Sequence, residues 1–356
     1  MMLSAGNGFI MQSEKYSRDN AGQSLKKYTL LKKGELAYNH GASKAKQFGC
    51  CYQLEVDEAL VPFVYHCFSV NKEYAPYIST VLNISTTERQ LKRLVSSSVR
   101  MDGLLNISYD DYMTVELTLP SMDEQQKVSC FLSLLEEKIK KQQQLVEHLK
   151  KYKRGAITLI LSNKDAYWKS GRLGDFITIN RGGSPRPIEA FITNDLDGVN
   201  WVKIGDVSED SLYITQTAEK ITAEGSRKSR KVFAGDLILS NSMSFGRPYI
   251  MQIEGCIHDG WLLLRDDGAC FDKKYLCYYL ASDEVLAQYK KYAAGSCVSN
   301  LNSELVSNVF IEFPPLEKQK EIASSLELLD ERINCEIKLL DKLLLIKKGL
   351  LQSLFI

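Results

Sequence analysis

Two long stretches of the chain carry apolar residues at alternating steps of three and four, with polar residues between them. This spacing indicates a helix with one narrow apolar face, which is typical of helices that pack along one another. The apolar face consists of Leu132, Leu135, Ile139, Val146 and Leu149 in the first stretch and of Leu326, Leu329, Ile333, Leu340 and Leu343 in the second. We therefore predict two long helices at 120–163 and 314–356. An alternative interpretation is that both are ordinary core helices of a single domain.

The second stretch repeats the first, because placing Pro314 on Pro120 aligns the two without a gap. Identical residues at equivalent positions include the pairs Pro120 and Pro314, Gln125 and Gln319, and Gly155 and Gly349. A glycine inside a helix costs about 1 kcal/mol relative to alanine. The glycine pair therefore suggests a kink or a close helix contact at both positions.

Each predicted helix follows a globular-looking segment that ends in an extended apolar run. A glycine followed by an acid and a leucine, a pattern typical of a turn into a strand, occurs at Gly34 and again at Gly235. These patterns predict an α+β protein with two related modules, 1–119 and 164–313, followed by helices at 120–163 and 314–356. When Gly34 is placed on Gly235, the first module has no counterpart of roughly residues 172–201. We therefore expect the first module to be incomplete at its N-terminus.

Length and composition narrow the class of protein. The 356 residues are enough for two domains, and 45 Lys and Arg against 44 Asp and Glu give a net charge of +1. Any site for a polyanion must therefore be local. The nine cysteines form no regular framework, and neither a signal peptide nor a membrane-spanning apolar run is evident. These features favour a cytoplasmic protein without a membrane partner.

Signatures of catalysis are scarce. The sequence has no GxSxG elbow, Walker loop, GxGxxG strand-to-helix turn or HExxH motif. No histidine has a partner at the spacing of metal ligands, so we expect no metal site and no catalytic residue. His258 and Asp259 could be a base and its orienting acid, but a buried, hydrogen-bonded histidine explains His258 better.

Local clusters of basic and short polar residues are better candidates for a site, since they can contact phosphates and base edges. The candidate DNA-binding residues are Arg181, Gly182, Gly183, Ser184, Arg186, Lys203, Arg227, Lys228, Arg230, Lys231, Ser240, Asn241, Ser242, Arg247, Ser296 and Asn300 in the second module, and Asn39, Lys44 and Arg100 in the first. Each charged run could equally be a solvated loop. A further basic group, 150–154, lies late in the first predicted helix. We interpret it as structural, because cations near a helix C-terminus interact favourably with the helix dipole.

Several phrases together resemble the specificity subunits of type I restriction-modification systems. They are the P-x4-Q helix entries at Pro120 and Pro314, the continuation LL-x-E-x-I in both copies, LGDF at 173–176, GGSP at 182–185, WVKIGD at 201–206, GDLILS at 235–240, KKGELAYN at 32–39 and SVRMDGLLNIS at 98–108. They cover nearly the whole chain in the order that the family has. The missing opening of the first module makes the chain resemble an N-terminally truncated member.

The resemblance implies two target recognition domains, each reading half of a bipartite site in double-stranded DNA. It implies that the domains are separated by long conserved helices packed as an antiparallel coiled coil, whose seam residues given above belong to the helices that dock methyltransferase (modification) subunits. Those partners would carry S-adenosylmethionine and methylate adenine, and a restriction (translocase) subunit would use ATP and Mg. This chain would then bind no cofactor and perform no chemistry.

Two other functions stay open. The chain could be a truncated or degenerate assembly subunit that docks the methyltransferase but reads only a half-site or no sequence. It could also be an enzyme that uses His258 and Asp259, although the sequence offers no further support for one.

Overall fold

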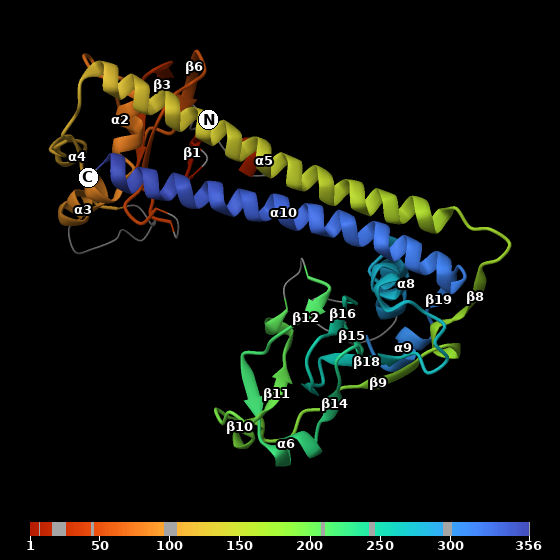
Figure 1. Ribbon diagram of the computed structural model, residues 1–356. Helices are drawn as coiled ribbons and strands as arrows, with labels where there is room; N and C mark the ends of the chain where they lie inside the picture. Colours follow the sequence, from red (N-terminus) through yellow and green to blue (C-terminus); the bar gives the residue numbers. More distant parts are fainter. Residues whose placement is uncertain are drawn as a thin grey trace. The chain divides into compact units, whose positions relative to one another are not determined.

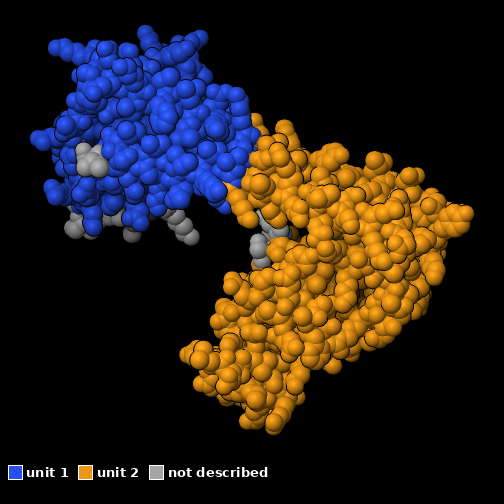
Figure 2. Space-filling view, viewed as in Figure 1, with its two compact units in different colours: residues 1–143, 339–356 blue, residues 144–338 orange. Residues whose placement is uncertain are grey.

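The computed structural model describes residues 1–6, 8–15, 26–43, 46–95, 105–207, 211–241, 246–294 and 301–355 (Figure 1). The chain forms two compact units, unit 1 with residues 1–143 and 339–356 and unit 2 with residues 144–338 (Figure 2). Each unit contains both helices and sheets, so the predicted α+β class is confirmed.

Unit 1 is built from short antiparallel strands and small helices. Its elements before the first long helix are β1 (Met2–Ser4), β2 (Gly8–Ile10), α1 (Gln12–Lys15), β3 (Thr29–Lys32), β4 (Leu36–Asn39), β5 (Cys50–Gln53), β6 (Glu58–Val61), β7 (His66–Phe68), α2 (Ala75–Val81), α3 (Ser85–Leu94) and α4 (Tyr109–Met113). The strands pair as β1–β2, β3–β6 and β5–β4–β7. The core forms where Leu36 and Tyr38 of β4 pack with Tyr77 and Ile78 of α2.

Unit 2 has two five-stranded sheets. Its elements between the long helices are β8 (Lys169–Arg172), η2 (Leu173–Asp175), β9 (Thr178–Arg181), η3 (Ile188–Ala190), β10 (Ile192–Thr193), β11 (Val199–Val202), η4 (Ile204–Asp206), β12 (Tyr213–Ile214), β13 (Glu219–Ile221), α6 (Ala223–Arg227), β14 (Arg230–Val232), β15 (Leu237–Ser240), β16 (Pro248–Met251), β17 (Gly255–Ile257), β18 (Trp261–Arg265), α7 (Lys273–Leu280), α8 (Asp283–Ala294), α9 (Ser303–Ser307) and β19 (Phe310–Phe313). The sheet orders are β10-β13-β11-β17-β14 and β12-β16-β15-β18-β9, and β19 pairs with β8. Because Trp261 is fully buried, the start of β18 is fixed in the core of this unit.

The predicted relation between the two modules is visible in the turns before β4 and β15. Gly34 and Gly235 both have a positive φ, +91° and +89°, which favours glycine. The carboxylate of Glu35 accepts a hydrogen bond from the backbone N–H of Lys32, and Asp236 accepts one in the same way from Phe233. The two turns therefore have the same local design.

Two long helices are present where they were predicted, α5 (Met122–Ser162) and α10 (Leu316–Leu354). Of the predicted seam, Leu132, Ile139, Val146, Leu326, Ile333 and Leu343 are buried, while Leu135, Leu149, Leu329 and Leu340 are partly buried. In unit 2, Lys153 forms an ion pair with Asp330, and Leu161 shares a core with Ile322. The order of these contacts shows that α5 and α10 run antiparallel within this unit.

The repeated glutamines explain why both helices begin where they do. Gln319 is fully buried, its Oε1 accepts a hydrogen bond from the backbone N–H of Asp272 at 2.9 Å, and its Nε2 donates to the carbonyl of Pro314. Gln125 repeats this arrangement with the backbone N–H of Tyr74, at 3.0 Å, and the carbonyl of Pro120. Each glutamine thereby joins the start of a long helix to the residue that precedes α7 or α2.

The close helix contact suggested for Gly155 and Gly349 is wrong. A Cβ atom at either position would have no neighbouring heavy atom within 4 Å. Both glycines therefore lie on open faces of their helices.

Candidate nucleic-acid interface

Three of the predicted DNA-binding segments of unit 2 meet around one turn, residues 258–260 between β17 and β18. The segments are 181–186 after β9, 227–231 between α6 and β14, and 240–241 at the end of β15. They are far apart in the sequence, so the sheet that contains β9, β15 and β18 is what brings two of them together.

The glycines of the 181–186 loop lie directly against this turn. The backbone N–H of Gly182 donates to the carbonyl of Trp261 at 2.8 Å, and that of Gly183 donates to the carbonyl of Ile257 at 3.1 Å. A Cβ at Gly182 would clash with the carbonyl oxygen of His258. Glycine is therefore required here by close packing of two backbones.

Asp259 holds the polar part of the same loop. Its Oδ1 accepts a hydrogen bond from the Ser184 hydroxyl at 2.9 Å, and its Oδ2 lies 3.7 Å from the Arg186 guanidinium. Nε of Arg181 donates to the backbone carbonyl of Asp259 at 3.2 Å. Burial disfavours ionisation of Asp259, but the Ser184 hydrogen bond and nearby cations outweigh it, so its pKa is lowered. The carboxylate is thus a fixed anion beneath two exposed arginines.

The basic segment 227–231 is tied to the glycine loop. The Ser229 hydroxyl donates to the carbonyl of Gly183 at 2.6 Å, and Nε of Arg230 donates to the carbonyl of Arg181 at 3.2 Å. The four cations of this segment, Arg227, Lys228, Arg230 and Lys231, are exposed. We name the exposed cations of these two segments, which are these four with Arg181 and Arg186, the β9–β14 basic surface.

Lys228 differs from the other cations of this surface. Its Nζ forms an ion pair with Glu224 at 2.8 Å and lies 4.6 Å from the centre of the Phe191 ring. A phosphate would have to compete with these partners. We therefore expect Lys228 to contribute less than Arg227 or Lys231.

Ser240 and Asn241 were expected to face DNA, and the structure corrects their place. Both are buried, with 0 % and 4 % of their surface exposed. Oγ of Ser240 accepts a hydrogen bond from the backbone N–H of Arg247 at 3.0 Å, and Nδ2 of Asn241 donates to the carbonyl of Asp259 at 2.8 Å. Their polar groups are used to fix the turn, so they position the surface and do not belong to it.

Three further predicted residues within the described ranges have other surroundings. Lys203 precedes η4 and forms an ion pair with Glu219. Arg247 lines a separate pocket of unit 2. Asn39 belongs to unit 1, where its Oδ1 accepts a hydrogen bond from the backbone N–H of Gly41 at 2.9 Å. Lys44, Arg100, Ser242, Ser296 and Asn300 lie outside the described residues.

His258 has the structural role that its sequence context favours. Its Nδ1 accepts a hydrogen bond from the backbone N–H of Gly260 at 2.7 Å, whereas Oδ1 of Asp259 is 3.6 Å away and already bound by Ser184. Burial lowers the pKa of His258, against the opposing effect of Asp259. This geometry does not support a base oriented by an acid.

Sequence reasoning identified the charged segments but missed the element that organises them. His258 and Asp259 had been considered as a base and its orienting acid, with a buried, hydrogen-bonded histidine as the better explanation, and neither Gly260 nor Ser229 was among the candidate residues. The sequence does contain a Gly-Gly-Ser loop and a distant polar turn. That the two lie against each other could be inferred only from the order of the strands, which the sequence patterns do not give.

Two general features of the described ranges complete the description. Within them, no group of three or more His, Cys, Asp or Glu side chains could hold a metal ion. No helix in these ranges is both long and apolar enough to cross a membrane.

A glycine-rich loop and exposed cations fixed on one turn are typical of a nucleic-acid-binding surface. Residues 166–345, half of the chain, match the model of the family described as type I restriction modification DNA specificity domain. The chain therefore belongs to this family.

Two curated relatives come from Methanocaldococcus jannaschii. The type I restriction enzyme MjaVIII specificity subunit is 27% identical over 191 residues, covering 53% of this chain and 42% of the relative. The putative type I restriction enzyme MjaX specificity subunit is 30% identical over 201 residues, covering 53% of this chain and 45% of the relative. The chain thus spans less than half of the length of these relatives.

Solved structures with a similar fold are also known. A chain from a study of the assembly and conformational transition of the type I R-M system has a TM-score of 0.63 at 17% identity, covering 92% of this chain and 83% of that chain. The type I restriction-modification system S subunit from M. genitalium has a TM-score of 0.52 at 14% identity, covering 93% and 85%. These likenesses show that the fold is shared.

Proposed function

We propose that this chain is a non-catalytic DNA-recognition subunit of a type I restriction-modification complex. The observation that carries the proposal is the β9–β14 basic surface, fixed by the turn at Asp259. Arginines held over a rigid turn can contact phosphates and guanine edges with little loss of side-chain freedom. The family match, which covers unit 2 almost completely, supports a sequence-reading role for this unit.

The partners follow from the same proposal. Partner methyltransferase subunits would hold S-adenosylmethionine and methylate adenine, and a restriction subunit would use ATP and Mg, so this chain would need no cofactor. The reaction would take place in the cytoplasm, where chromosomal DNA and these subunits meet.

The long helices would form an antiparallel coiled coil that separates two recognition domains. Because buried seam residues such as Leu132 and Leu326 are already covered within the chain, they can hold the helices together but cannot meet a partner directly. The methyltransferase would therefore dock on exposed faces of α5 and α10. This refines the expectation that the seam belongs to the docking helices.

A second function, that of a subunit reading only a half-site or no sequence, is favoured by the extent of the family match. The match begins at residue 166 and leaves residues 1–165 outside it. A chain whose unit 1 has lost recognition would still dock the methyltransferase through its helices.

Co-expression of the chain with its candidate modification subunit, followed by methylome sequencing, distinguishes these functions. A bipartite motif with methylated adenines supports the recognition subunit with both units active. A single short motif supports reading of a half-site by unit 2 alone. A stable complex without any motif supports the assembly subunit.

A charge-reversal variant adds a test of the surface. Replacing Arg227 and Lys231 by Glu should abolish methylation without loss of the complex, because both side chains are exposed. Lys220→Glu, a single charge reversal elsewhere in unit 2, is the control. Unchanged methylation in the double variant would overturn the assigned surface.

A further inference from the structure

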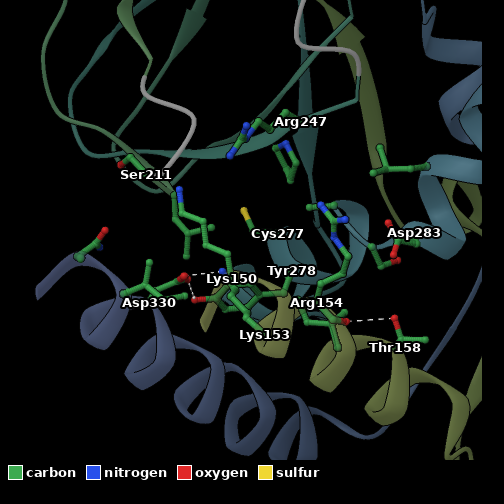
Figure 3. Close-up of a pocket in the computed structure, with 18 residues that line it drawn as sticks. Lys150, Lys153, Arg154, Thr158, Ser211, Arg247, Cys277, Tyr278, Asp283 and Asp330 are labelled. Atoms are coloured by element: carbon green, nitrogen blue, oxygen red, sulfur yellow. Dashed lines mark hydrogen bonds and ion pairs between the residues drawn. The ribbon is translucent and has the colours of Figure 1, made fainter. Parts of the chain in front are cut away.

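A pocket of about 280 Å³ lies within unit 2, away from the turn at Asp259 (Figure 3). Its walls come from α5, α7, α8 and α10 and from residues beside β12 and β16. Ligand sites usually measure about 300–1,000 Å³, so the pocket suits a small ligand.

Cations outnumber carboxylates among the side chains that line this pocket. The cations are Lys150, Lys153, Arg154 and Arg247, and the carboxylates are Asp283 and Asp330. In a chain with a net charge of only +1, such a local excess is a distinct feature. It favours an anionic ligand.

One ion pair in the pocket has a structural role. Nζ of Lys153 lies 2.5 Å from Oδ1 of Asp330, and the Tyr278 hydroxyl donates to Oδ2 of Asp330 at 2.8 Å. Lys153 also lies 4.7 Å from the centre of the Tyr278 ring. These contacts pair Lys153 with Asp330, and the other charged residues of the lining are Lys150, Arg154, Arg247 and Asp283.

From the sequence, the cations at 150–154 were interpreted as structural, through a favourable interaction with the C-terminal end of the helix. Their position in α5 excludes this interpretation. Favourable interaction with a helix C-terminus is confined to about the last turn, whereas α5 continues to Ser162. At 3.6 residues per turn, Lys150 lies roughly three turns before this end. Lys150 and Arg154 are also four residues apart, where like charges repel each other. A bound anion would offset that repulsion.

The directions of these side chains converge. Figure 3 shows Lys150 and Arg154 extending from α5 toward the side of the pocket where Arg247 lies. Lys150 and Arg247 also have contacts within the protein. A lysine has three donors and an arginine five, so such contacts leave further donors for the oxygens of a ligand.

Apolar residues of the lining indicate what the uncharged part of the ligand would contact. Ile157, Leu212, Leu286 and Ile333 give the pocket an apolar side. We propose that the pocket binds a small organic phosphate, with its phosphate group at Lys150, Arg154 and Arg247 and its uncharged part against the apolar side.

Such a ligand would be connected with the turn at Asp259 through Arg247. The backbone N–H of Arg247 donates a hydrogen bond to Oγ of Ser240. Asn241, the residue after Ser240, donates one from its side chain to the carbonyl of Asp259. Binding in the pocket would therefore stabilise the segment that positions the β9–β14 basic surface.

Isothermal titration calorimetry of the full chain tests the proposal without DNA or partner subunits. Its result is therefore independent of the proposed function. The titrants are inorganic phosphate and AMP, at a constant ionic strength set by chloride. The variants are Lys150→Gln and Arg154→Gln, with Lys151→Gln as the matched control because Lys151 is the next residue of α5 and does not line the pocket. Circular dichroism checks that each variant is folded, and Arg154→Lys keeps the charge.

We expect saturable binding that weakens about tenfold or more in Lys150→Gln and Arg154→Gln and less than about twofold in Lys151→Gln. Tighter binding of AMP than of phosphate supports an organic phosphate, whereas equal binding overturns the assigned apolar contact. No saturable binding, or an equal loss in Lys151→Gln, overturns the site. A titration with a DNA duplex distinguishes a small phosphate ligand from the phosphates of DNA. If the pocket variants weaken only the binding of the duplex, the pocket contacts DNA and the proposal is wrong.

Discussion

The hydroxyl of Ser184 donates a hydrogen bond to Oδ1 of Asp259 across 75 residues of sequence. Asp259 also contacts Arg186 and, through its backbone carbonyl, Arg181. The Ser184 bond thus adds to the backbone hydrogen bonds of Gly182 and Gly183 that join the glycine loop to the turn. The exposed arginines therefore belong to a loop whose conformation is fixed by hydrogen bonds.

Replacing Ser184 by Ala should lower the free energy of unfolding by about 1 kcal/mol, the usual net value of an intramolecular hydrogen bond, because Asp259 is partly exposed and its charge is screened by solvent. Urea denaturation of the wild type and the variant measures this difference. Ser170→Ala, at an exposed position of the same unit, is the control and should change stability by less than about 0.5 kcal/mol. Equal effects of both substitutions would mean that the Ser184 bond does not brace the loop.

Replacing Gln319 by Leu should be far more costly. It would leave the backbone N–H of Asp272 and the carbonyls of Cys270 and Pro314 without this partner. Buried groups without partners cost about 1–3 kcal/mol each, so we expect a loss of at least about 2 kcal/mol in chemical denaturation. Gln144→Leu, on an exposed face of α5, is the control. A small effect at Gln319 would show that the repeated glutamine does not fix the helix start.

Local patterns sufficed for some of these features. Heptad spacing predicted both long helices, and the repeat singled out Gln125 and Gln319 before their hydrogen bonds were known. Gly34 and Gly235 were predictable because a positive φ is a local requirement.

The place of a side chain within the sheets was not predictable in the same way. Ser240 and Asn241 look like surface residues in the sequence, but β15 lies between β16 and β18, which buries its end. The contact of Lys228 with Phe191 and the pocket around Lys150 likewise depend on contacts that local spacing does not specify.

Stability should depend on pH through His258. Burial lowers its pKa from an ordinary value of 6.5, so the unfolded chain takes up the proton more readily than the folded one. The stabilisation is complete above pH 6.5 and is lost as the pH falls toward the lowered pKa of the folded state. Protonation would also remove the acceptor used by Gly260.

Urea denaturation between pH 5 and pH 8 checks this dependence. His258→Asn does not titrate, and its side-chain oxygen can still accept from Gly260. We therefore expect the wild type to lose stability relative to this variant as the pH falls, with a slope of no more than about 1.4 kcal/mol per pH unit. Asp206, Asp259 and Lys203 also act on the His258 ring, and they are present in both proteins. Parallel profiles would show that His258 is not the responsible group.

The cations of the β9–β14 basic surface should differ in their contribution to DNA binding. Each phosphate contact adds about 0.9 to the slope of log affinity against log salt. Arg227→Gln combined with Lys231→Gln should therefore reduce this slope by up to about 1.8 in fluorescence anisotropy with a DNA duplex. Lys228→Gln should reduce it by less than about 0.5, because Lys228 is paired with Glu224. A reduction of about 0.9 in Lys228→Gln, the share of one phosphate contact, would contradict the smaller contribution assigned to this lysine.

Gly155→Ala and Gly349→Ala should each stabilise the chain. Both glycines lie inside helices, and a Cβ at either would meet open space. Alanine is favoured over glycine in a helix interior by about 0.5–1 kcal/mol, so the free energy of unfolding should rise by this amount. Gly246→Ala is a control of opposite sign, since Gly246 has a φ of +74° and its Cβ would lie 2.6 Å from Tyr289. If Gly155→Ala or Gly349→Ala stabilises the isolated chain but weakens its complex with the modification subunit, the glycine is needed for close approach of that partner. If either substitution destabilises the isolated chain, the conclusion that a Cβ at that glycine meets open space is wrong.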